Sequence, residues 1–280
     1  MKFSNAGCRL LRIAAILFVL CSLASSLAFS AETLKISILH MNDPHGHYAP
    51  DDDKSGSVGG FAKAQTVLKE LSSRNSTEGR ETLILMAGDL LTGTPFSMVF
   101  KGKMGVDLMN KMGFNAMTVG NHEFDYGQDN LLNTLRPLMQ FPMLSANTKT
   151  SSGSNVFESM IEKKYPNTST RVIIIGLTTE ETPITTHPNN IKGLVFDDPL
   201  STAKDLLKDA KDEDLIIALT HIGIEDDKKL AEACPRIDVI IGGHTHTKID
   251  PPIKVGNTII CQASAYAKYV GKLDVESADG

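Results

Sequence analysis

Residues 171–177 have the sequence RVIIIGL, and this stretch decides the fold class of the chain. Its apolar residues are nearly continuous, which indicates a strand that is buried on both faces. In layered α/β proteins a sheet is buried in this way because other layers cover both of its sides. The stretch therefore predicts an α/β fold rather than a single half-exposed sheet.

Apolar strands alternate with helical patterns on both sides of this stretch. Helical spacing of apolar residues predicts helices at residues 61–71, 96–112, 131–139 and 200–210. Short β-branched and apolar runs predict strands at residues 34–39, 82–87, 116–119, 171–177, 215–220, 238–241, 258–262 and 270–276. From residue 238 onward the strands leave no room for a helix, so we expect a mixed sheet there.

Residues 1–30 have the features of a secretory signal peptide. A basic segment with Lys2 and Arg12 precedes the almost wholly apolar residues 13–29, and Ala28 and Ser30 are small residues suited to a cleavage site. We expect cleavage after Ser30 and a secreted or periplasmic protein. The alternative is an uncleaved anchor, but the apolar run is short for a span of about 20 residues. No other segment is comparably apolar, so we expect no stable membrane span after cleavage.

The remaining part, residues 31–280, is acidic and long enough for one large domain or two small ones. The whole chain has a formal net charge of −5, and removal of the basic leader makes the rest more acidic. Such a surface gives no electrostatic reason to bind nucleic acid polymers or anionic membranes. Cys234 and Cys261 remain after cleavage, and export permits either a disulfide or two free thiols.

Five polar clusters follow predicted strands, and most of the eight histidines belong to them. The clusters are Asn42–Gly46, Gly88–Asp89, Gly120–Asp125, Thr220–His221 and Gly242–His246. Loops at the carboxyl ends of strands in an α/β sheet converge on one crevice, so these separated segments can meet at one place. Their glycines allow sharp turns and a close approach of the backbone.

The residue types in the clusters predict a pair of metal ions. Aspartate oxygen and imidazole nitrogen are ligands of zinc, manganese and similar divalent ions. Residues separated by one position, such as Asp43 with His45 and His244 with His246, can both point inward from an extended loop. A carboxylate such as Asp89 can bridge two ions that lie about 3.5–4 Å apart.

Single members of the clusters also have purely structural interpretations. Asp89 could cap the next helix, Asn121 could belong to a turn, and His221 could be a hydrogen-bonded core residue. The joint pattern of the clusters favours metal binding over these interpretations. Glu123 is expected to orient its neighbours without binding an ion. The remaining histidines are expected to be loop or surface residues: His40, His47 and His187.

The clusters resemble the successive motifs of the calcineurin-like metallophosphoesterases. Further stretches resemble the 5'-nucleotidase branch of that family: Leu39–Asp43, Gly59–Ala62, Gly93–Pro95, Phe124–Gly127 and Ser145–Asn147. The similarity extends over about residues 34–275. It implies a layered α/β/β/α metallophosphoesterase sandwich with mixed sheets, equivalent to the N-terminal catalytic domain of the family.

The resemblance also implies a role for each site residue. One divalent ion would be held by Asp43, His45, Asp89 and His246. The other would be held by Asp89, Asn121, His221 and His244. The family often has Gln or Asn where this chain has His246, and imidazole can replace an amide oxygen as a ligand. His122 and Asp125 resemble the catalytic pair, and residues three apart can meet across one helical turn.

The expected activity is hydrolysis of phosphate esters by metal-bound hydroxide, most specifically a 5'-nucleotidase-like removal of phosphate from nucleotides. The ions would lower the pKa of a bound water to about 7. Asn121 would bind a phosphoryl oxygen, and His122 would stabilise the transition state. One alternative is a broad exported phosphoesterase, such as a UDP-sugar or cyclic-nucleotide phosphodiesterase. A non-catalytic nucleotide-binding or adhesion protein on the same scaffold is the alternative from another class, and the intact ligand set argues against it.

Full-length 5'-nucleotidases carry a second, C-terminal domain that contributes arginines and aromatic rings to nucleotide binding. The last predicted strand of this chain ends at residue 276, close to Gly280. We therefore expect residues 31–280 to form the catalytic domain without the C-terminal substrate domain.

Overall fold

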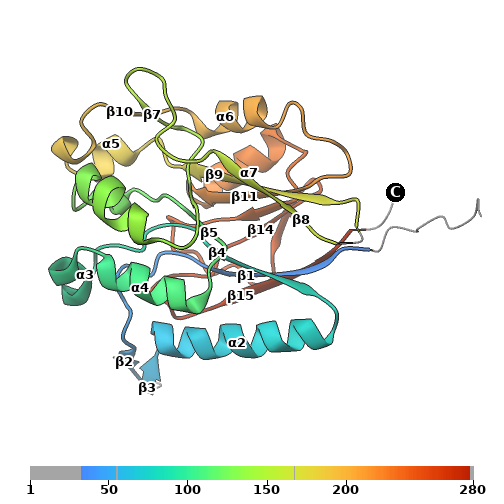
Figure 1. Ribbon diagram of the computed structural model, residues 1–280, viewed down its shortest axis with the longest axis horizontal. Helices are drawn as coiled ribbons and strands as arrows, with labels where there is room; N and C mark the ends of the chain where they lie inside the picture. The colour runs from blue at the N-terminus through green and yellow to red at the C-terminus, as the bar shows by residue number, and fades with distance from the viewer. Residues whose placement is uncertain (1–32, 55, 167, 278–280) are drawn as a thin grey trace, which may run out of the picture. The chain divides into compact units, whose positions relative to one another are not determined.

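A computed structural model of the chain describes residues 33–277 except residues 55 and 167 (Figure 1). The predicted signal peptide and its cleavage site lie outside these residues. In the part of the chain that the structure describes, no helix is long and apolar enough to cross a membrane.

The secondary structure follows the expected alternation of strands and helices. The strands are β1 (Lys35–Met41), β2 (Asp51–Asp53), β3 (Gly56–Val58), β4 (Glu81–Met86), β5 (Ala116–Thr118), β6 (Met143–Leu144), β7 (Thr148–Thr150), β8 (Met160–Lys164), β9 (Arg171–Thr178), β10 (Leu194–Phe196), β11 (Leu215–His221), β12 (Val239–Ile241), β13 (Ile253–Val255), β14 (Thr258–Cys261) and β15 (Gly271–Glu276). The α-helices are α2 (Phe61–Thr77), α3 (Pro95–Phe100), α4 (Lys103–Met112), α5 (Thr182–Thr185), α6 (Pro199–Leu206) and α7 (Ile224–Ala233). Short 3-10 helices are η1 (His122–Phe124), η3 (Arg136–Leu138) and η4 (Pro188–Ile191), and η2 (Asn130–Leu135) is a π-helix.

Two mixed sheets form the centre of the fold. In sheet 1 the order is β15-β1-β4-β5-β6, with β15 antiparallel to β1 and the other pairs parallel. In sheet 2 the order is β13-β14-β12-β11-β9-β8, with antiparallel pairs at its two edges. Its central strands β9, β11, β12 and β14 are parallel. Since β1, β4 and β5 are parallel in sheet 1 as well, each sheet gathers the carboxyl ends of several strands at one edge.

The alternation of side chains along the strands builds three apolar layers. Ile36 and Ile38 of β1 pack between the sheets together with Ile174 of β9 and Ile217 of β11. Their neighbours point the opposite way, since Ile173 of β9 packs in a separate outer cluster. Each central strand is therefore buried on both faces, as the continuous apolar runs predict.

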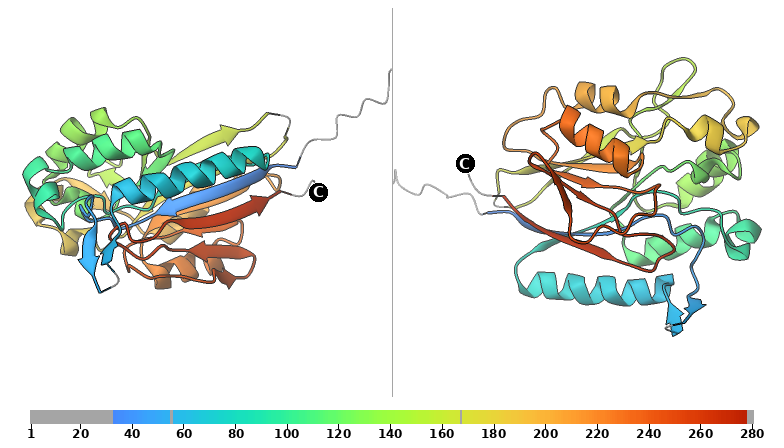
Figure 2. Two further views of the ribbon diagram at one scale, coloured as in Figure 1. Left: turned by 90° about the horizontal axis from the view of Figure 1, so that it is seen from below. Right: turned by 180° about the vertical axis from the view of Figure 1, so that it is seen from behind.

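Helices cover the outer faces of both sheets. Leu68 of α2 and Met109 of α4 pack with Met41 of β1 on sheet 1. Ala203 of α6 and Leu230 of α7 pack on the outer face of sheet 2. Figure 1 shows α2 at the bottom and α6 near the top with the strands between them, and the right panel of Figure 2 shows this order from behind. The predicted α/β/β/α layering with mixed sheets is confirmed.

Some predicted elements differ from the structure. The single helix expected at residues 96–112 is wrong, because α3 ends at Phe100 and α4 begins at Lys103. Lys101 and Gly102 have φ angles of 45° and 87°, which break the helix, and a Cβ on Gly102 would lie 2.2 Å from Leu91 Cδ2. The sequence interpretation also missed α7 and several short strands: β6, β7, β8, β10 and β13.

Candidate metal centre

The predicted ligands lie at the carboxyl ends of parallel strands in both sheets. In sheet 1, Asp43 and His45 follow β1, Asp89 follows β4 and Asn121 follows β5. In sheet 2, His221 is the last residue of β11, and the loop with His244 and His246 follows β12. Because these strand ends share one edge of the sandwich, side chains distant in sequence meet there.

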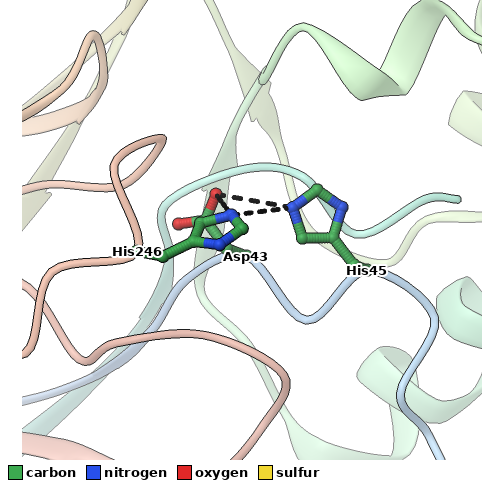
Figure 3. Close-up of side chains that lie close together, drawn as sticks. All are labelled: Asp43, His45 and His246. Atoms are coloured by element: carbon green, nitrogen blue, oxygen red, sulfur yellow. Dashed lines mark hydrogen bonds and ion pairs between the residues drawn. The ribbon is translucent and has the colours of Figure 1, made fainter. Parts of the chain in front are cut away.

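One group of donor atoms comes from Asp43, His45 and His246, whose candidate ligand atoms all lie within 4.8 Å of one another. His246 Nε2 lies 3.0 Å from His45 Nε2 and 3.3 Å from Asp43 Oδ1. His45 Nε2 lies 3.8 Å from the same carboxylate oxygen. Figure 3 shows the two rings and the carboxylate pointing toward one another. This spacing suits three ligands of one cation.

A second group comes from Asp89, His221 and His244. His221 Nε2 lies 3.0 Å from Asp89 Oδ2, and the same oxygen lies 3.6 Å from His45 Nε2 in the first group. Asp89 also belongs to an overlapping group with His45 and His122. The Asp89 carboxylate therefore lies between the donor sets and can be shared by two cations.

The protonation pattern of His221 supports a cation in the second group. His221 Nδ1 lies 2.7 Å from the carbonyl oxygen of Ala87, and a carbonyl only accepts, so Nδ1 carries the proton. In the neutral ring, Nε2 then presents a lone pair to the Asp89 carboxylate. Two facing lone pairs repel, so this arrangement calls for a cation or a second proton between them.

The pKa values show how strongly the site attracts positive charge. Burial opposes the charged form of His221, but the carboxylates of Asp89 and Asp43 outweigh it and raise its pKa to about 10. Burial likewise opposes ionisation of Asp89, yet His221, His45 and His122 hold the pKa of that carboxyl well below its usual range. A protein free of metal would fill the site with protons, which divalent ions would displace.

Asn121 gives an independent sign of a missing partner. Its side-chain oxygen is buried and has no hydrogen-bond partner among the described residues. Buried polar atoms are nearly always satisfied, and an amide oxygen is also a metal ligand. The residues present therefore fit a divalent cation in each of the two donor groups.

The backbone at the site is unusual as well. Asp43, His45, Asp89, His244 and His246 all have positive φ angles, between 45° and 77°. Such angles are uncommon outside glycine and asparagine, and backbone strain of this kind concentrates at functional sites.

Glycines allow close approach of the loops here, both between the two sheets and within sheet 1. A Cβ on Gly243 would lie 2.3 Å from the Ala87 carbonyl oxygen, and one on Gly120 would lie 2.2 Å from Asp89 Oδ1. Larger residues at these positions would push the donor groups apart. The expected role of glycine in a close backbone approach is confirmed at these two positions.

Glu123 orients the site without joining a donor group. Its carboxylate is buried and accepts hydrogen bonds from the N–H groups of Asp89 at 2.9 Å, Gly120 at 2.7 Å and Leu90 at 2.7 Å. Burial, followed by the negative charge of Asp89, raises the pKa of Glu123 to about 7. The structure thus shows Glu123 in the orienting position that the sequence predicts.

His122 and Asp125 meet as their spacing predicts, across the 3-10 turn η1. His122 Nδ1 donates to Asp125 Oδ2 at 2.6 Å, and Thr186 Oγ1 donates to the other carboxylate oxygen at 2.9 Å. The hydrogen bond to Asp125 is the main cause that raises the pKa of His122 to about 9, against the effect of burial. Without bound cations the ring is therefore mostly protonated at neutral pH, with Nε2–H free to donate.

A cavity of about 780 Å³ opens over these groups. His45, Asp89, His122 and His244 line it, while His221 is fully buried below. Some lining residues were missed in the sequence: Thr92, His47, Asp51, Tyr266 and Lys268. Tyr266 and Lys268 follow β14, far in sequence from any recognised motif. Only the three-dimensional fold brings them to the cavity.

Of the other histidines only His40 differs from expectation, and the cysteines follow one of the two alternatives left open by the sequence. His40 is not a loop or surface residue, because it is buried in β1 against Gly271, and burial lowers its pKa to about 4. His47 lies in a loop and contacts Asp51 at 2.9 Å. His187 accepts a hydrogen bond at the start of η4. Cys234 and Cys261 are both free thiols.

Known proteins resemble this chain over most of its length. The family described as calcineurin-like phosphoesterase matches residues 36–248. A snake venom 5'-nucleotidase of Gloydius brevicauda is 35% identical, over 90% of this chain and 47% of its own length. The 5'-nucleotidase of Vibrio vulnificus is 32% identical, over 89% of this chain and 50% of its own.

A solved structure shows the same relationship. The NAD nucleotidase of Haemophilus influenzae superposes with a TM-score of 0.76 and 29% identity, over 88% of this chain and 48% of its own. The chain thus spans about half the length of the relatives that it matches.

Proposed function

This chain belongs to the calcineurin-like phosphoesterase family, and we propose that it removes phosphate from nucleotides with two divalent metal ions. Family membership supports metal-dependent hydrolysis of phosphate esters in general. The observation that carries the proposal is the position of Asp89, whose carboxylate lies between two donor groups supplied by both sheets. The relatives named 5'-nucleotidase make a nucleotide the leading substrate.

We assign the ligands from the donor groups and the unpartnered atoms. One ion is held by Asp43, His45, Asp89 and His246. The other is held by Asp89, Asn121, His221 and His244. Such a pair lowers the pKa of bound water and neutralises phosphoryl oxygens. Zinc and manganese both suit the mixed imidazole and carboxylate set.

The other residues of the cavity position the substrate and stabilise charge. The side-chain amide of Asn121 would donate its N–H group to a phosphoryl oxygen, and its unpartnered oxygen would be available to an ion. His122 lines the cavity, where its Nε2–H would stabilise negative charge on the phosphoryl group or the leaving oxygen. Asp125 keeps the ring in this orientation through Nδ1.

We also propose that the protein acts outside the cytoplasm. Support comes from the signal-like residues 1–30 and from a relative found in snake venom. In this view residues 31–280 form the catalytic domain, and the substrate is a nucleotide or another small phosphate ester.

Metal analysis and substrate hydrolysis test the proposal together. The purified protein is expected to contain two divalent ions and to hydrolyse AMP, with UDP-glucose, a cyclic nucleotide and p-nitrophenyl phosphate as comparison substrates. A chelator should abolish activity, and added Mn²⁺ or Zn²⁺ should restore it. Hydrolysis that persists in chelator, or that is absent with every substrate, would refute the proposal.

The variant His122→Ala tests the catalytic assignment separately. We expect kcat to fall by about 10²–10⁴-fold while the metal content stays the same, because this ring contacts the substrate and not the ions. Unchanged turnover in that variant would remove His122 from the mechanism.

A further inference from the structure

The segment that follows β14 forms hydrogen bonds with the loop that contains His244 and His246. Gln262 is buried in this segment, and its side-chain amide donates to the carbonyl oxygen of Gly243 at 2.9 Å. Its amide oxygen accepts from Thr245 Oγ1 at 3.2 Å and from the N–H group of Thr247. One side chain thus bonds the loop before, between and after the two histidines.

Tyr266 makes contact with all three members of the first donor group. Its backbone N–H donates to the Asp43 carbonyl oxygen at 2.8 Å. Its ring centroid lies 5.3 Å from that of His246, nearly perpendicular at 77°, and 5.9 Å from that of His45. Both imidazole rings therefore pack against the same aromatic ring.

These contacts oppose an unfavourable backbone. His244, His246 and Tyr266 have φ angles of 77°, 55° and 60°. Left-handed conformations at residues with a Cβ persist only where the surroundings impose them. Gln262 supplies hydrogen bonds on both sides of His244 and His246. The hydrogen bond from its backbone N–H to the Asp43 carbonyl oxygen holds Tyr266.

We propose that Gln262 and Tyr266 are positioning residues for the cation held by Asp43, His45 and His246. Gln262 fixes the loop so that His246 faces Asp43, and the Tyr266 ring limits the rotation of both imidazoles. Neither residue binds the ion. The inference rests on the proposed two-metal function, and side chains that orient ligands typically change metal affinity by about 10–100-fold when removed.

Titration of metal-free protein with Mn²⁺ tests this role, with both binding events followed by calorimetry. Tyr266→Leu removes the ring and is expected to weaken one event by about 10-fold or more. Tyr266→Phe keeps the ring and should bind within about twofold of the unmodified protein. Tyr269→Leu is a matched control, because that partly exposed ring faces Lys248 and not the histidines.

Gln262→Met removes all three hydrogen bonds at similar volume and should also weaken one binding event by about 10–100-fold. Thermal unfolding of the metal-free proteins separates positioning from general packing. Lost affinity in folded Tyr266→Leu, with a melting temperature like that of the Tyr269 control, supports the proposal. Wild-type affinity for both ions in Tyr266→Leu overturns it, even if the melting temperature falls.

The two proposals fail in distinguishable ways. If the unmodified protein binds fewer than two ions, the two-metal function is wrong, and the positioning role falls with it. If the unmodified protein binds two ions and the folded variants bind them equally well, only the positioning role is wrong.

Discussion

Replacement of Asp125 by Asn should change the pH dependence of the reaction in a calculable way. The hydrogen bond from His122 to Asp125 is the largest cause that raises the pKa of His122 from its ordinary 6.5 to about 9. Asparagine has nearly the same shape and still accepts a hydrogen bond from Nδ1–H, but it carries no charge. The pKa of His122 in this variant should therefore return toward about 6.5.

The size of the effect follows from the protonated fraction of His122. At pH 8 a group with a pKa of about 9 is about 90% protonated, and one with a pKa of about 6.5 is about 3% protonated. If the mechanism needs the cationic ring, the rate at pH 8 should fall by about 30-fold, and by much less at pH 6. Bound cations lower the pKa of His122 in both proteins, so the difference between the two profiles is the test.

The assay is kcat against pH for AMP hydrolysis with saturating metal, in both proteins. We expect the alkaline limb to move to lower pH by up to about 2.5 units in Asp125→Asn. The His122→Ala variant is the control and should lack this limb. Parallel profiles in the two proteins, with the same alkaline limb, would refute the reasoning that Asp125 keeps His122 charged.

Other perturbations test separate parts of the site. Asp89→Asn removes the shared carboxylate, so purified protein should hold at most one ion by elemental analysis; two retained ions would contradict a bridging role. Glu123→Gln replaces one carboxylate oxygen by an NH₂ group, which cannot accept the hydrogen bonds that backbone N–H groups donate to Glu123. The free energy of unfolding in urea should therefore fall by about 1–3 kcal/mol. An unchanged value would show that these hydrogen bonds are dispensable. The pKa values of His122 and His221 are raised to about 9 and about 10, so their contribution to the stability of metal-free protein is complete below about pH 6.5 and lost as the pH rises through 9–10. Thermal melts of metal-free protein should show this loss above pH 7, and a melting temperature that rises from pH 7 to 10 would exclude it.

Local sequence patterns were enough to predict the layers. The strands β9 and β11 are continuous apolar runs, which only a sheet covered on both faces can bury. Helix α7 was missed because most of its residues, EDDKK and AEA included, are polar or small, and its buried side is short. The break between α3 and α4 was missed because helical spacing of apolar residues continues across Lys101, where the backbone φ angle is 45°.

The donor residues were predictable because each lies at or just after the end of a strand, within a short polar motif. The residues that orient them were only partly predictable. Glu123 lies inside such a motif, whereas Gln262 and Tyr266 are far in sequence from the loops that they contact. His40 was misplaced because a histidine just before a motif gives no local sign of burial, and its neighbour Gly271 belongs to a distant strand. Long-range contacts of this kind require the fold itself.

The most direct measurement of the central claim is anomalous diffraction from crystals of the protein grown with Mn²⁺. We expect two anomalous peaks about 3.5–4 Å apart, with the Asp89 carboxylate between them and Asp43 and His221 on different ions. A single peak, or two peaks that do not share Asp89, would contradict the account.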